Sequence, residues 1–372
     1  MARRTNTTTR RTVLQGAGTA IVGTSVASAT VSASGKVENI RLPRLKKSED
    51  EVLEHHEVPR DWWNHIQAAK EALENLKPRI ANIEGVYSAG LKKSDEPVEE
   101  FGGLSGREIV VRVDMDDTPD LSFVQEQNGF NITTVEAPKP ELGGSCHNLW
   151  PVDDVPGGQA VSADLNGTAG FAASSQQIDA SGLVTCEHLW QGFCDESNLY
   201  DSLYVGHSGN REDFGTIAAE DDNLDAVFVE ENTSKDVEPV VKEAPSDTVP
   251  VAGFLTESGV QMADENVRRC HKVGAATGHR TGYINYTNEN SWSPKCPTWN
   301  NEGVTYDMGG VDGDSGGPIY VKNNNGEAEL ISLFTEYYPC VSIGCEEDCS
   351  GKAIGNPIGG PSVYSILNKL SV

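Results

Sequence analysis

Ser315 lies in the segment 309–320, which reads GGVDGDSGGPIY. A serine that attacks a carbonyl carbon needs an accessible hydroxyl group and backbone N–H groups directed at the oxyanion that forms. The surrounding glycines permit a tight turn that would direct the N–H groups of Gly313 and Ser315 into one small oxyanion hole. The segment therefore predicts a nucleophilic serine. The alternative is a glycine-rich turn between two strands.

The hexapeptide GDSGGP, residues 313–318, resembles the nucleophile signature of the chymotrypsin-like serine peptidases. Residues 155–173 are also similar to the opening of the bacterial members, in which a GG turn leads to a GTxGF-like motif, here residues 167–171. A serine hydroxyl alone is inert, so it needs a base in contact and a carboxylate that orients the base. The resemblance implies that both precede the serine, in the order His, Asp, Ser.

The resemblance implies that His188 is the base. This histidine follows a strand-like run in LVTCEHLW, where Thr185 takes the threonine position of the family's T-A-x-H motif. The competing histidine, His207, lies in a turn without a family match. Glu187 and Leu189 depart from the pattern, which has a small residue before this histidine and a cysteine after it. A Glu187 carboxylate directed at the imidazole would raise the pKa of His188 and keep the base protonated.

Asp225 is the orienting carboxylate that the resemblance implies. It opens the apolar run AVFV, residues 226–229, and approximately matches the family's D-x-A-hydrophobic segment. The alanine stands directly after the aspartate, which is a small departure from that pattern. Asp221 and Asp222 precede it, and we expect them in a solvated acidic loop.

Asp314 stands directly before the nucleophile, where the fold would bury it. The segment KVGAATG, residues 272–278, resembles a K-x-G-x-x-T-G segment of bacterial members whose basic residue can neutralise this acid. A buried carboxylate without a partner is costly. We therefore expect an ion pair between Lys272 and Asp314, and the alternative is a solvent-facing lysine on a hairpin.

By family position, the substrate pocket should be lined by residues 306–311 and 331–336. Gly309 is expected near its base, and the wall after the nucleophile should come from four consecutive residues, Ile331, Ser332, Leu333 and Phe334. No acidic residue falls at the base, so a preference for Lys or Arg in the substrate is not supported. Asp307 and Glu336 lie near enough to keep that question open.

The formal net charge is −27, from 56 acidic and 29 basic residues. Nucleic-acid binding depends on cationic contacts with phosphates, so this composition argues against a nucleic-acid partner. The acidic residues recur along the chain, in DEPVEEF, EDDNLD and CEEDCS among other places. We expect a surface adapted to high salt, where screening weakens self-repulsion. The alternative is an ordinary acidic secreted protein.

The first residues resemble an export signal. Residues 9–14, TRRTVL, are similar to the twin-arginine motif, and a weakly apolar run follows to about Ala33. Ala27 and Ala29 offer an A-x-A cleavage site. The run is too polar for a stable membrane span. We therefore expect residues 1–35 to be a twin-arginine-type signal peptide and the mature protein to be extracellular.

The chain has eight cysteines, all in its last two-thirds. An even count in an exported chain favours disulfides. Local spacing suggests pairing of Cys186 with Cys194, and of Cys270 with Cys296. The cluster at 340–349 could instead suggest a metal site, but no matching histidine or second cysteine pair lies nearby. We therefore expect no metal and no cofactor.

Residues 36–140 predict a small α/β module. We expect residues 36–58 to be mobile, because they are charged and mixed. Residues 61–84 carry apolar side chains at three- and four-residue spacings, which predicts a helix that ends or kinks near Pro78. The runs 108–113 and 130–135 read as strands. Two interpretations stay open, a pro-segment that is later removed or a permanent accessory domain, and we prefer the first.

Residues 141–372 are expected to form the peptidase domain. From residue 155 onward, short β-prone runs alternate with turns, which favours a barrel or sandwich. The final segment, SVYSILNKL, has helical spacing. With the resemblance, the predicted fold is mainly β, a chymotrypsin-like double six-stranded antiparallel β-barrel with a C-terminal helix. The predicted strands are 168–173, 183–186, 203–207, 226–230, 249–254, 281–286, 318–321 and 329–335.

Together these features predict a secreted serine endopeptidase, expected to be a monomer, that hydrolyses polypeptides through an acyl-enzyme. The alternative is a non-catalytic secreted binding module on the same fold. It is favoured by Glu187 and by the lack of a cysteine directly after His188. A third, weaker interpretation is esterase chemistry on the same triad. An α/β-hydrolase is disfavoured, because its nucleophile precedes the aspartate and histidine in the chain.

Overall fold

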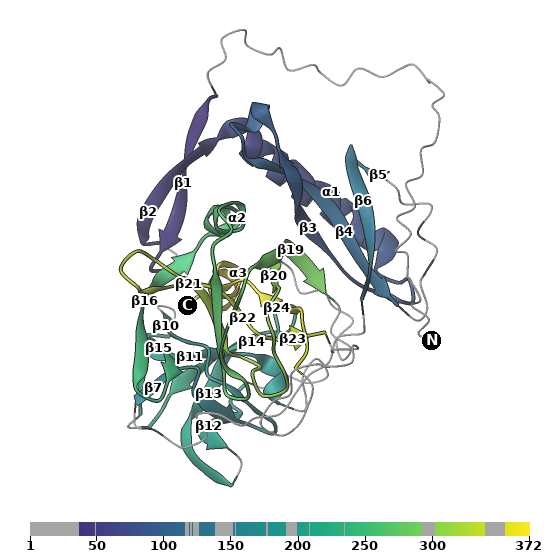
Figure 1. Ribbon diagram of the computed structural model, residues 1–372. Helices are drawn as coiled ribbons and strands as arrows, with labels where there is room; N and C mark the ends of the chain where they lie inside the picture. Colours follow the sequence, from purple (N-terminus) through teal and green to yellow (C-terminus); the bar gives the residue numbers. More distant parts are fainter. Residues whose placement is uncertain are drawn as a thin grey trace, which may run out of the picture. The chain divides into compact units, whose positions relative to one another are not determined.

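Figure 1 shows the computed structural model of the chain. The predicted signal peptide and six of the eight cysteines lie outside the described residues. Within the described part of the chain, no helix is long and apolar enough to cross a membrane. The structure describes residues 37–48, 50–115, 119, 121, 126–137, 152, 154–175, 178–190, 199–207, 209–233, 235–291, 302–338 and 354–372.

The segment that we expected to be mobile forms an antiparallel hairpin instead. Its strands are β1 (Asn39–Lys46) and β2 (Val52–Pro59). β1 also pairs with β16 (Asp247–Leu255), where Leu45 lies opposite Leu255. The prediction was wrong because the strand that stabilises this hairpin is distant in the chain, and the local composition is dominated by exposed charged residues.

Helix α1 (Arg60–Ile80) matches the predicted helix and ends two residues after Pro78. It packs against β3 (Val86–Pro97) and β4 (Ser105–Asp114), which pair antiparallel, and β6 (Phe130–Ala137) runs parallel to β4. The helix buries one apolar stripe consisting of Trp62, Ile66, Ala69, Ala72, Leu73, Leu76 and Ile80. Two short elements complete this module, η1 (Glu99–Phe101) and β5 (Glu126–Gln127).

The first barrel sheet is antiparallel throughout and has the order β10-β11-β14-β13-β12-β8-β9. Its apolar side chains, such as Leu183, Val205, Phe214 and Val229, are fully buried in one core. The strands are β8 (Ala160–Ser162), β9 (Asn166–Thr168), β10 (Phe171–Ser175), β11 (Ala180–Thr185), β12 (Ser202–His207), β13 (Asn210–Asp221) and β14 (Ala226–Glu231).

The C-terminal half contains two helices and the remaining strands except β7, which precedes the first barrel sheet in the chain and pairs with β15. Helix α3 (Val363–Leu370) matches the predicted closing helix and packs its apolar face on the core. Helix α2 (Glu257–Glu265), which was not predicted, begins after Thr256, whose side chain accepts the N–H of Gly259. The strands are β7 (Asp154–Gly157), β15 (Asp236–Ala244), β17 (Cys270–Gly274), β18 (Gly278–Gly282), β19 (Ile284–Ser291), β20 (Gly303–Tyr306), β21 (Pro318–Lys322), β22 (Ala328–Leu333), β23 (Glu336–Tyr337) and β24 (Ile358–Pro361).

The N-terminal module shares its sheets with the C-terminal half. β3 pairs with β19, so one sheet runs β23-β24-β20-β19-β3-β4-β6-β5. Buried charges are paired across the same contact: Arg112 Nη1 lies 3.1 Å from Glu289 Oε1, and Arg107 Nη2 lies 3.1 Å from Asp264 Oδ2. Strand pairing and ion pairs therefore join the residues before the expected boundary near residue 140 to those after it.

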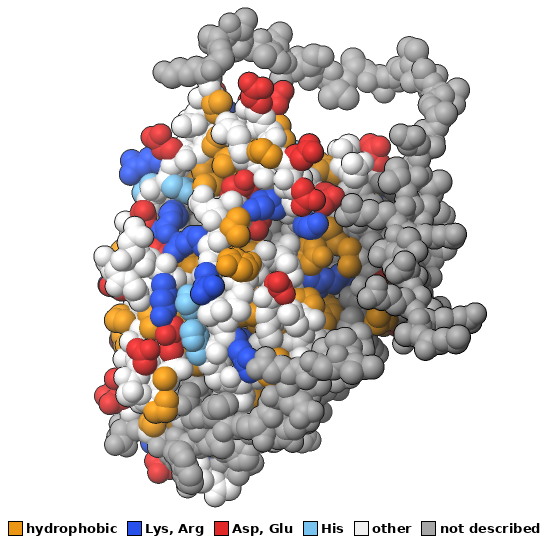
Figure 2. All heavy atoms as spheres, viewed as in Figure 1, with side chains coloured by type: hydrophobic (Ala, Val, Ile, Leu, Met, Phe, Trp, Pro, Cys, Tyr) orange, Lys and Arg blue, Asp and Glu red, His pale blue; other side chains and the backbone are white. Residues whose placement is uncertain are grey.

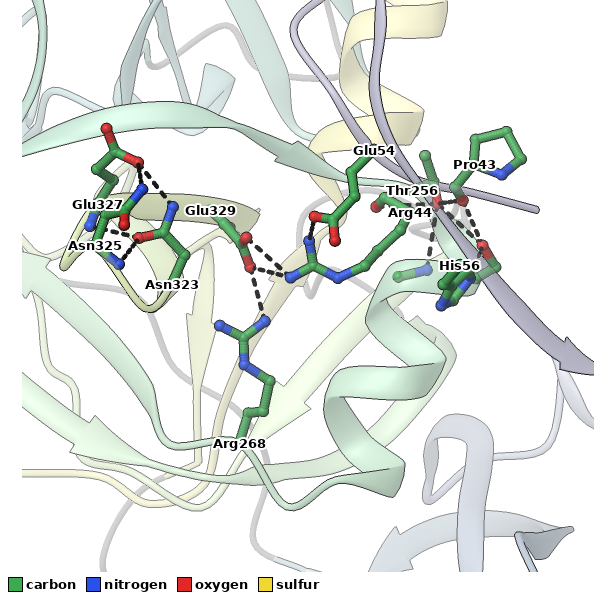
Figure 3. Close-up of polar contacts among 12 residues, drawn as sticks. Pro43, Arg44, Glu54, His56, Thr256, Arg268, Asn323, Asn325, Glu327 and Glu329 are labelled. Atoms are coloured by element: carbon green, nitrogen blue, oxygen red, sulfur yellow. Dashed lines mark hydrogen bonds and ion pairs between the residues drawn. The ribbon is translucent and has the colours of Figure 1, made fainter. Parts of the chain in front are cut away.

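Figure 3 shows a second contact between the module and the barrel. Glu329 on β22 is buried, and its carboxylate is 2.7 Å from Arg44 Nη2 and 2.7 Å from Arg268 Nη1. Arg44 belongs to β1 and also pairs with Glu54. Removing one partner of a buried charge leaves it uncompensated. Glu329 therefore connects the module to the barrel through Arg44, while Arg268 pairs with the same carboxylate from the barrel side.

The structure describes two of the eight cysteines. Cys186 and Cys270 are the two cysteines among the described residues, and both are buried free thiols. The two pairings that local spacing suggested stay predictions, because each involves a cysteine outside the described residues. Their suggested partners, Cys194 and Cys296, and the cluster at 340–349 lie outside the described residues.

Acid is expected to destabilise the contact between module and barrel through His56. Burial, then the charge of Arg44, lowers the pKa of His56 to about 4, and its Nε2 lies 3.0 Å from Ser258 Oγ (Figure 3). The unfolded chain therefore binds more protons than the folded chain between pH about 6.5 and about 4, so stability falls as pH falls through that window.

The urea midpoint, measured at about pH 7 and about pH 4.5, tests this prediction. In His56→Gln the acid-induced loss should be smaller than in the wild type, because the titrating group is gone. His55→Gln, at the exposed neighbouring position, should keep the wild-type loss. Equal losses in all three proteins would show that His56 does not contribute.

Candidate active site

His188 lies directly after β11, on the short 3-10 helix η2 (Glu187–Leu189). Its side chain is buried, with 3% of the surface exposed. The end of β11 is held in place because the Thr185 hydroxyl donates to the Thr168 carbonyl at 2.8 Å. The strand and the helical turn together fix where the imidazole can lie.

Asp225 ends the turn between β13 and β14, in the left-handed region with φ of 49°. β14 pairs with β11, and Val227 lies opposite Thr185. This register brings Asp225 to His188: Oδ2 lies 2.6 Å from Nδ1, and Oδ1 accepts the N–H groups of Glu187 and His188 at 3.0 and 2.8 Å. The carboxylate therefore fixes both the ring and the backbone of the candidate base.

The surroundings of His188 raise its pKa. Burial alone would lower the pKa of His188, but the carboxylate of Asp225 and, after it, the sulfur of Cys186 raise it well above the ordinary value. The sequence predicted that Glu187 could have this effect. In the structure, the carboxylate that raises the pKa of His188 is that of Asp225. The same carboxylate orients the imidazole, as a general base requires.

Ser315 lies in a turn before β21, next to two candidate oxyanion donors. Gly313 has φ of 80°, a conformation that favours glycine. Within the described residues, neither the N–H of Gly313 nor that of Ser315 has a hydrogen-bond acceptor, and the buried Ser315 Oγ also has no partner. Two backbone donors and one hydroxyl are thus available for a ligand.

The structure does not form a hydrogen bond between Ser315 and His188. His188 Nε2 instead lies 3.8 Å from Cys186 Sγ. Catalytic hydrogen bonds often tighten only when substrate binds, so this geometry does not remove His188 as a base. Sequence reasoning missed Cys186 as a neighbour of the imidazole; its position two residues before the histidine was the available signal.

Lys272 and Asp314 form a fully buried ion pair, and the Thr277 hydroxyl donates to the same carboxylate at 2.7 Å. The other carboxylate oxygen, Oδ1, accepts the N–H groups of Ala276 and Thr277 at 3.0 and 2.9 Å. Gly274 permits this close approach, because a Cβ there would lie 2.0 Å from Oδ1. The segment 272–278 therefore anchors the residue beside the nucleophile.

Thr168 also braces the nucleophile turn, a role that sequence reasoning missed. Its hydroxyl donates to the Gly313 carbonyl at 2.6 Å, and its N–H donates to the Ser315 carbonyl at 2.7 Å. The same hydroxyl accepts the N–H of Ala275 at 2.8 Å. The threonine lies in the GTAGF segment, which we had used only as a sign of the fold.

The predicted pocket residues fall into two groups. Gly310, adjacent to Gly309, lies against the Phe334 ring, so the segments before and after the nucleophile do meet. Gly309 itself packs against Ile354. The remaining three predicted wall residues are fully buried: Ile331 and Leu333 are in hydrophobic cores, and the Ser332 hydroxyl is 2.7 Å from Tyr306 Oη.

Asp312 and Tyr337 were not predicted to meet. The Tyr337 hydroxyl donates to Asp312 Oδ1 at 2.8 Å, and both side chains are buried. Glu336 and Asp307 were the two acidic residues that could have favoured Lys or Arg in the substrate. Glu336 is buried on β23, and Asp307 accepts a hydrogen bond from Asn356 at 3.1 Å. The side chain of His207 lies outside the described residues.

No protein family model and no curated protein matches this chain. Solved structures do match, each at low identity. Thermobifida fusca protease A is 18% identical, over 58% of this chain and 95% of that one, with a TM-score of 0.41. Nocardiopsis protease is also 18% identical, over 58% and 96%, with a TM-score of 0.41. Cellulomonas bogoriensis chymotrypsin is 20% identical, over 58% and 94%, with a TM-score of 0.40.

The fold can be identified from the topology of the chain itself. An antiparallel sheet carries His188 and Asp225 at the ends of neighbouring strands, and Ser315 precedes β21 in the sheets of the C-terminal half. A helix closes the chain on the core. This chain has a chymotrypsin-like, mainly β fold.

Proposed function

We propose that this protein is a serine endopeptidase. The observation that carries the proposal is the contact between His188 Nδ1 and Asp225 Oδ2, 2.6 Å apart. Support also comes from the N–H groups of Gly313 and Ser315, which have no acceptor among the described residues. A serine hydroxyl, an imidazole oriented by a carboxylate and a pair of backbone N–H groups are the groups that acyl transfer requires. Peptides are the proposed substrate.

In the proposed reaction, Ser315 Oγ bonds to the carbonyl carbon of the substrate, and its proton passes to His188 Nε2. The N–H groups of Gly313 and Ser315 stabilise the oxyanion. The C–N bond then breaks, and His188 returns the proton to the leaving amine. Water repeats these steps on the acyl-enzyme, which frees Ser315. For the first step, the imidazole must turn from Cys186 toward Ser315.

The finer parts of the proposal rest on the sequence. We propose export through the twin-arginine-type signal at residues 1–35, and action outside the cell in high salt, for which the net charge of −27 is the support. Figure 2 shows acidic side chains interspersed with basic ones on one face of the described residues. We also propose that residues 36–140 act as a pro-segment, since their strands pair with the barrel.

A fluorophosphonate probe and intact-mass spectrometry test the proposed function. In multimolar salt the wild-type protein should gain one adduct, and Ser315→Ala should gain none, because only an activated serine is phosphonylated. Ser181→Ala, at an exposed position of β11, should keep the adduct. The mass of the labelled species also shows whether residues 36–140 remain attached.

An absence of adduct on a folded wild-type protein that has lost the module would contradict the proposal. The same chain would then be a secreted binding module on a peptidase fold. An adduct that persists in Ser315→Ala would place the reactive serine elsewhere and remove Ser315 from its proposed role.

A further inference from the structure

Three strands place Glu243, His271 and His279 together on a face that the proposed reaction does not use. Glu243 lies on β15, His271 on β17 and His279 on β18. His271 Nδ1 is 2.9 Å from His279 Nε2, and Glu243 Oε1 is 3.5 Å from His279 Nε2 and 3.9 Å from His271 Nδ1. One carboxylate oxygen and two imidazole nitrogens thus lie within 4.8 Å of one another.

These separations are those of ligands around a small cation. Zn²⁺ binds imidazole nitrogen and carboxylate oxygen at about 2.0–2.2 Å, and a tetrahedral arrangement puts such ligand atoms about 3.3 Å apart. The observed separations, 2.9 to 3.9 Å, bracket that value. The two imidazole nitrogens face each other in a hydrogen bond, so both rings must rotate before their lone pairs point at one ion. The side chain of His279 is 30% exposed, which leaves an entry path and a fourth position for water.

The candidate ligands are already oriented by their neighbours. The His271 ring stacks on His279 and on Tyr320, with centroids 5.2 and 5.4 Å apart. The Tyr320 hydroxyl donates to Glu243 Oε1, the oxygen that faces the two imidazoles, and Lys322 Nζ lies 2.8 Å from each oxygen of the same carboxylate. Groups that orient a ligand strengthen metal binding when they leave its binding atom free. Tyr320 occupies Oε1, so an ion would share that oxygen with the hydroxyl or bind Oε2. The positive charge of Lys322 acts against a cation, so we expect binding weaker than that of a closed structural zinc site.

Both imidazoles are suited to bind a metal near neutral pH. Burial, followed by the neighbouring imidazole and Lys322, lowers the pKa of His271 to about 4, and burial also lowers the pKa of His279. Neutral imidazole is the form that binds metals. One of the two facing nitrogens donates to the other in this contact. For a metal to bind both, that proton would have to sit on the other nitrogen of its ring.

We propose that Glu243, His271 and His279 form a binding site for Zn²⁺ or a similar transition-metal ion. Two imidazoles and one carboxylate suit such ions better than Ca²⁺ or Mg²⁺, which prefer oxygen ligands. This site reverses the sequence-based expectation of no metal, which considered only the cysteine cluster.

The ion would link β15 to the β17–β18 hairpin. That hairpin also carries Lys272, adjacent to His271, and its turn supplies the N–H groups that hold Asp314. Binding of the metal therefore stabilises the segment that anchors the residue beside Ser315. The effect on stability does not depend on whether Ser315 is catalytic.

Titration with Zn²⁺ and with Co²⁺ tests the site in the full-length chain carrying Ser315→Ala, which cannot cleave itself. This protein should bind one ion that His279→Gln in the same background binds at least tenfold more weakly. Bound Co²⁺ should show the visible absorption of a tetrahedral nitrogen and oxygen site, lost in the variant. His55→Gln is the matched control and should bind as the parent does.

All of these proteins share the same cysteines, so the difference between them isolates the histidine site. Zn²⁺ should raise the thermal unfolding midpoint of the parent and of His55→Gln, and should leave that of His279→Gln unchanged. If His279→Gln does not fold, Glu243→Gln replaces it, because the amide can still accept from Tyr320. Equal stoichiometry, affinity and Co²⁺ spectrum in parent and variant would overturn the proposal.

Discussion

Asp225→Asn is expected to lower kcat for peptide hydrolysis by about 10⁴-fold while the protein stays folded. The carboxylate now accepts the Nδ1 proton of His188 at 2.6 Å, which leaves Nε2 free to accept a proton from Ser315. An asparagine side chain can donate to Nδ1 instead, and the ring then carries its proton on Nε2, where it cannot act as a base. Asparagine also tolerates the left-handed backbone at this position.

The control for this prediction lies in the same turn. Asp222→Asn changes an exposed carboxylate and should leave kcat within twofold of the wild type. Circular dichroism of both variants would show that the fold is kept. A kcat for Asp225→Asn close to that of Asp222→Asn would show that Asp225 does not orient the base.

The pH profile adds a readout that a purely structural role of Asp225 would not change. Because the pKa of His188 is raised well above its ordinary value, the acid limb of kcat/KM in the wild type should lie above about pH 6.5. Removing the charge of Asp225 removes the main group that raises this pKa. The acid limb of the residual activity in Asp225→Asn should therefore move to lower pH, and an unmoved limb would contradict the assignment of His188 as the base.

Lys272→Met is expected to reduce the free energy of unfolding by about 3–5 kcal/mol, because it leaves the buried carboxylate of Asp314 without a cation. The N–H groups of Ala276 and Thr277 would remain, but they do not neutralise the charge. The turn that contains Gly313 and Ser315 depends on this anchor. The variant should therefore also react more slowly with the fluorophosphonate.

Urea unfolding of three proteins separates the ion pair from a general effect of losing a lysine. Lys47→Met removes an exposed pair with Glu51 and should change stability by about 0.5 kcal/mol or less. The double variant Lys272→Met with Asp314→Asn should recover part of the loss, because no charge stays buried. Unchanged stability and labelling in Lys272→Met would refute the proposed role of the pair.

Local motifs made several parts of the protein predictable. The segment 61–84 carries apolar residues at helical spacing, and α1 buries most of them, with Trp63 only partly buried. Likewise, the runs around 226–230 and 329–335 became β14 and β22, because branched and aromatic residues favour strands wherever they are placed. These elements depend on neighbours within a few residues, which a sequence displays directly.

Other elements were not predictable because their partners are distant. The hairpin of β1 and β2 pairs with β16 through β1. Glu329 forms ion pairs with Arg44 and Arg268, which come from two other segments. Cys186 lies beside the imidazole of His188. The predicted pocket residues Ile331 and Leu333 are packed in hydrophobic cores. In each case the identity of the residue was known, but its surroundings were not.

The sequence by itself determined which residues could carry chemistry: a serine within GDSGGP, a histidine after a strand, an aspartate before one, and a lysine that could neutralise Asp314. Only the tertiary structure decided that β11 and β14 pair in the register that puts Asp225 against His188, and that three distant strands bring Glu243, His271 and His279 together. The reason is physical. Residue type sets what a side chain can donate, accept or bind, whereas its pKa and its partners depend on burial and strand register, which arise only when distant segments pack.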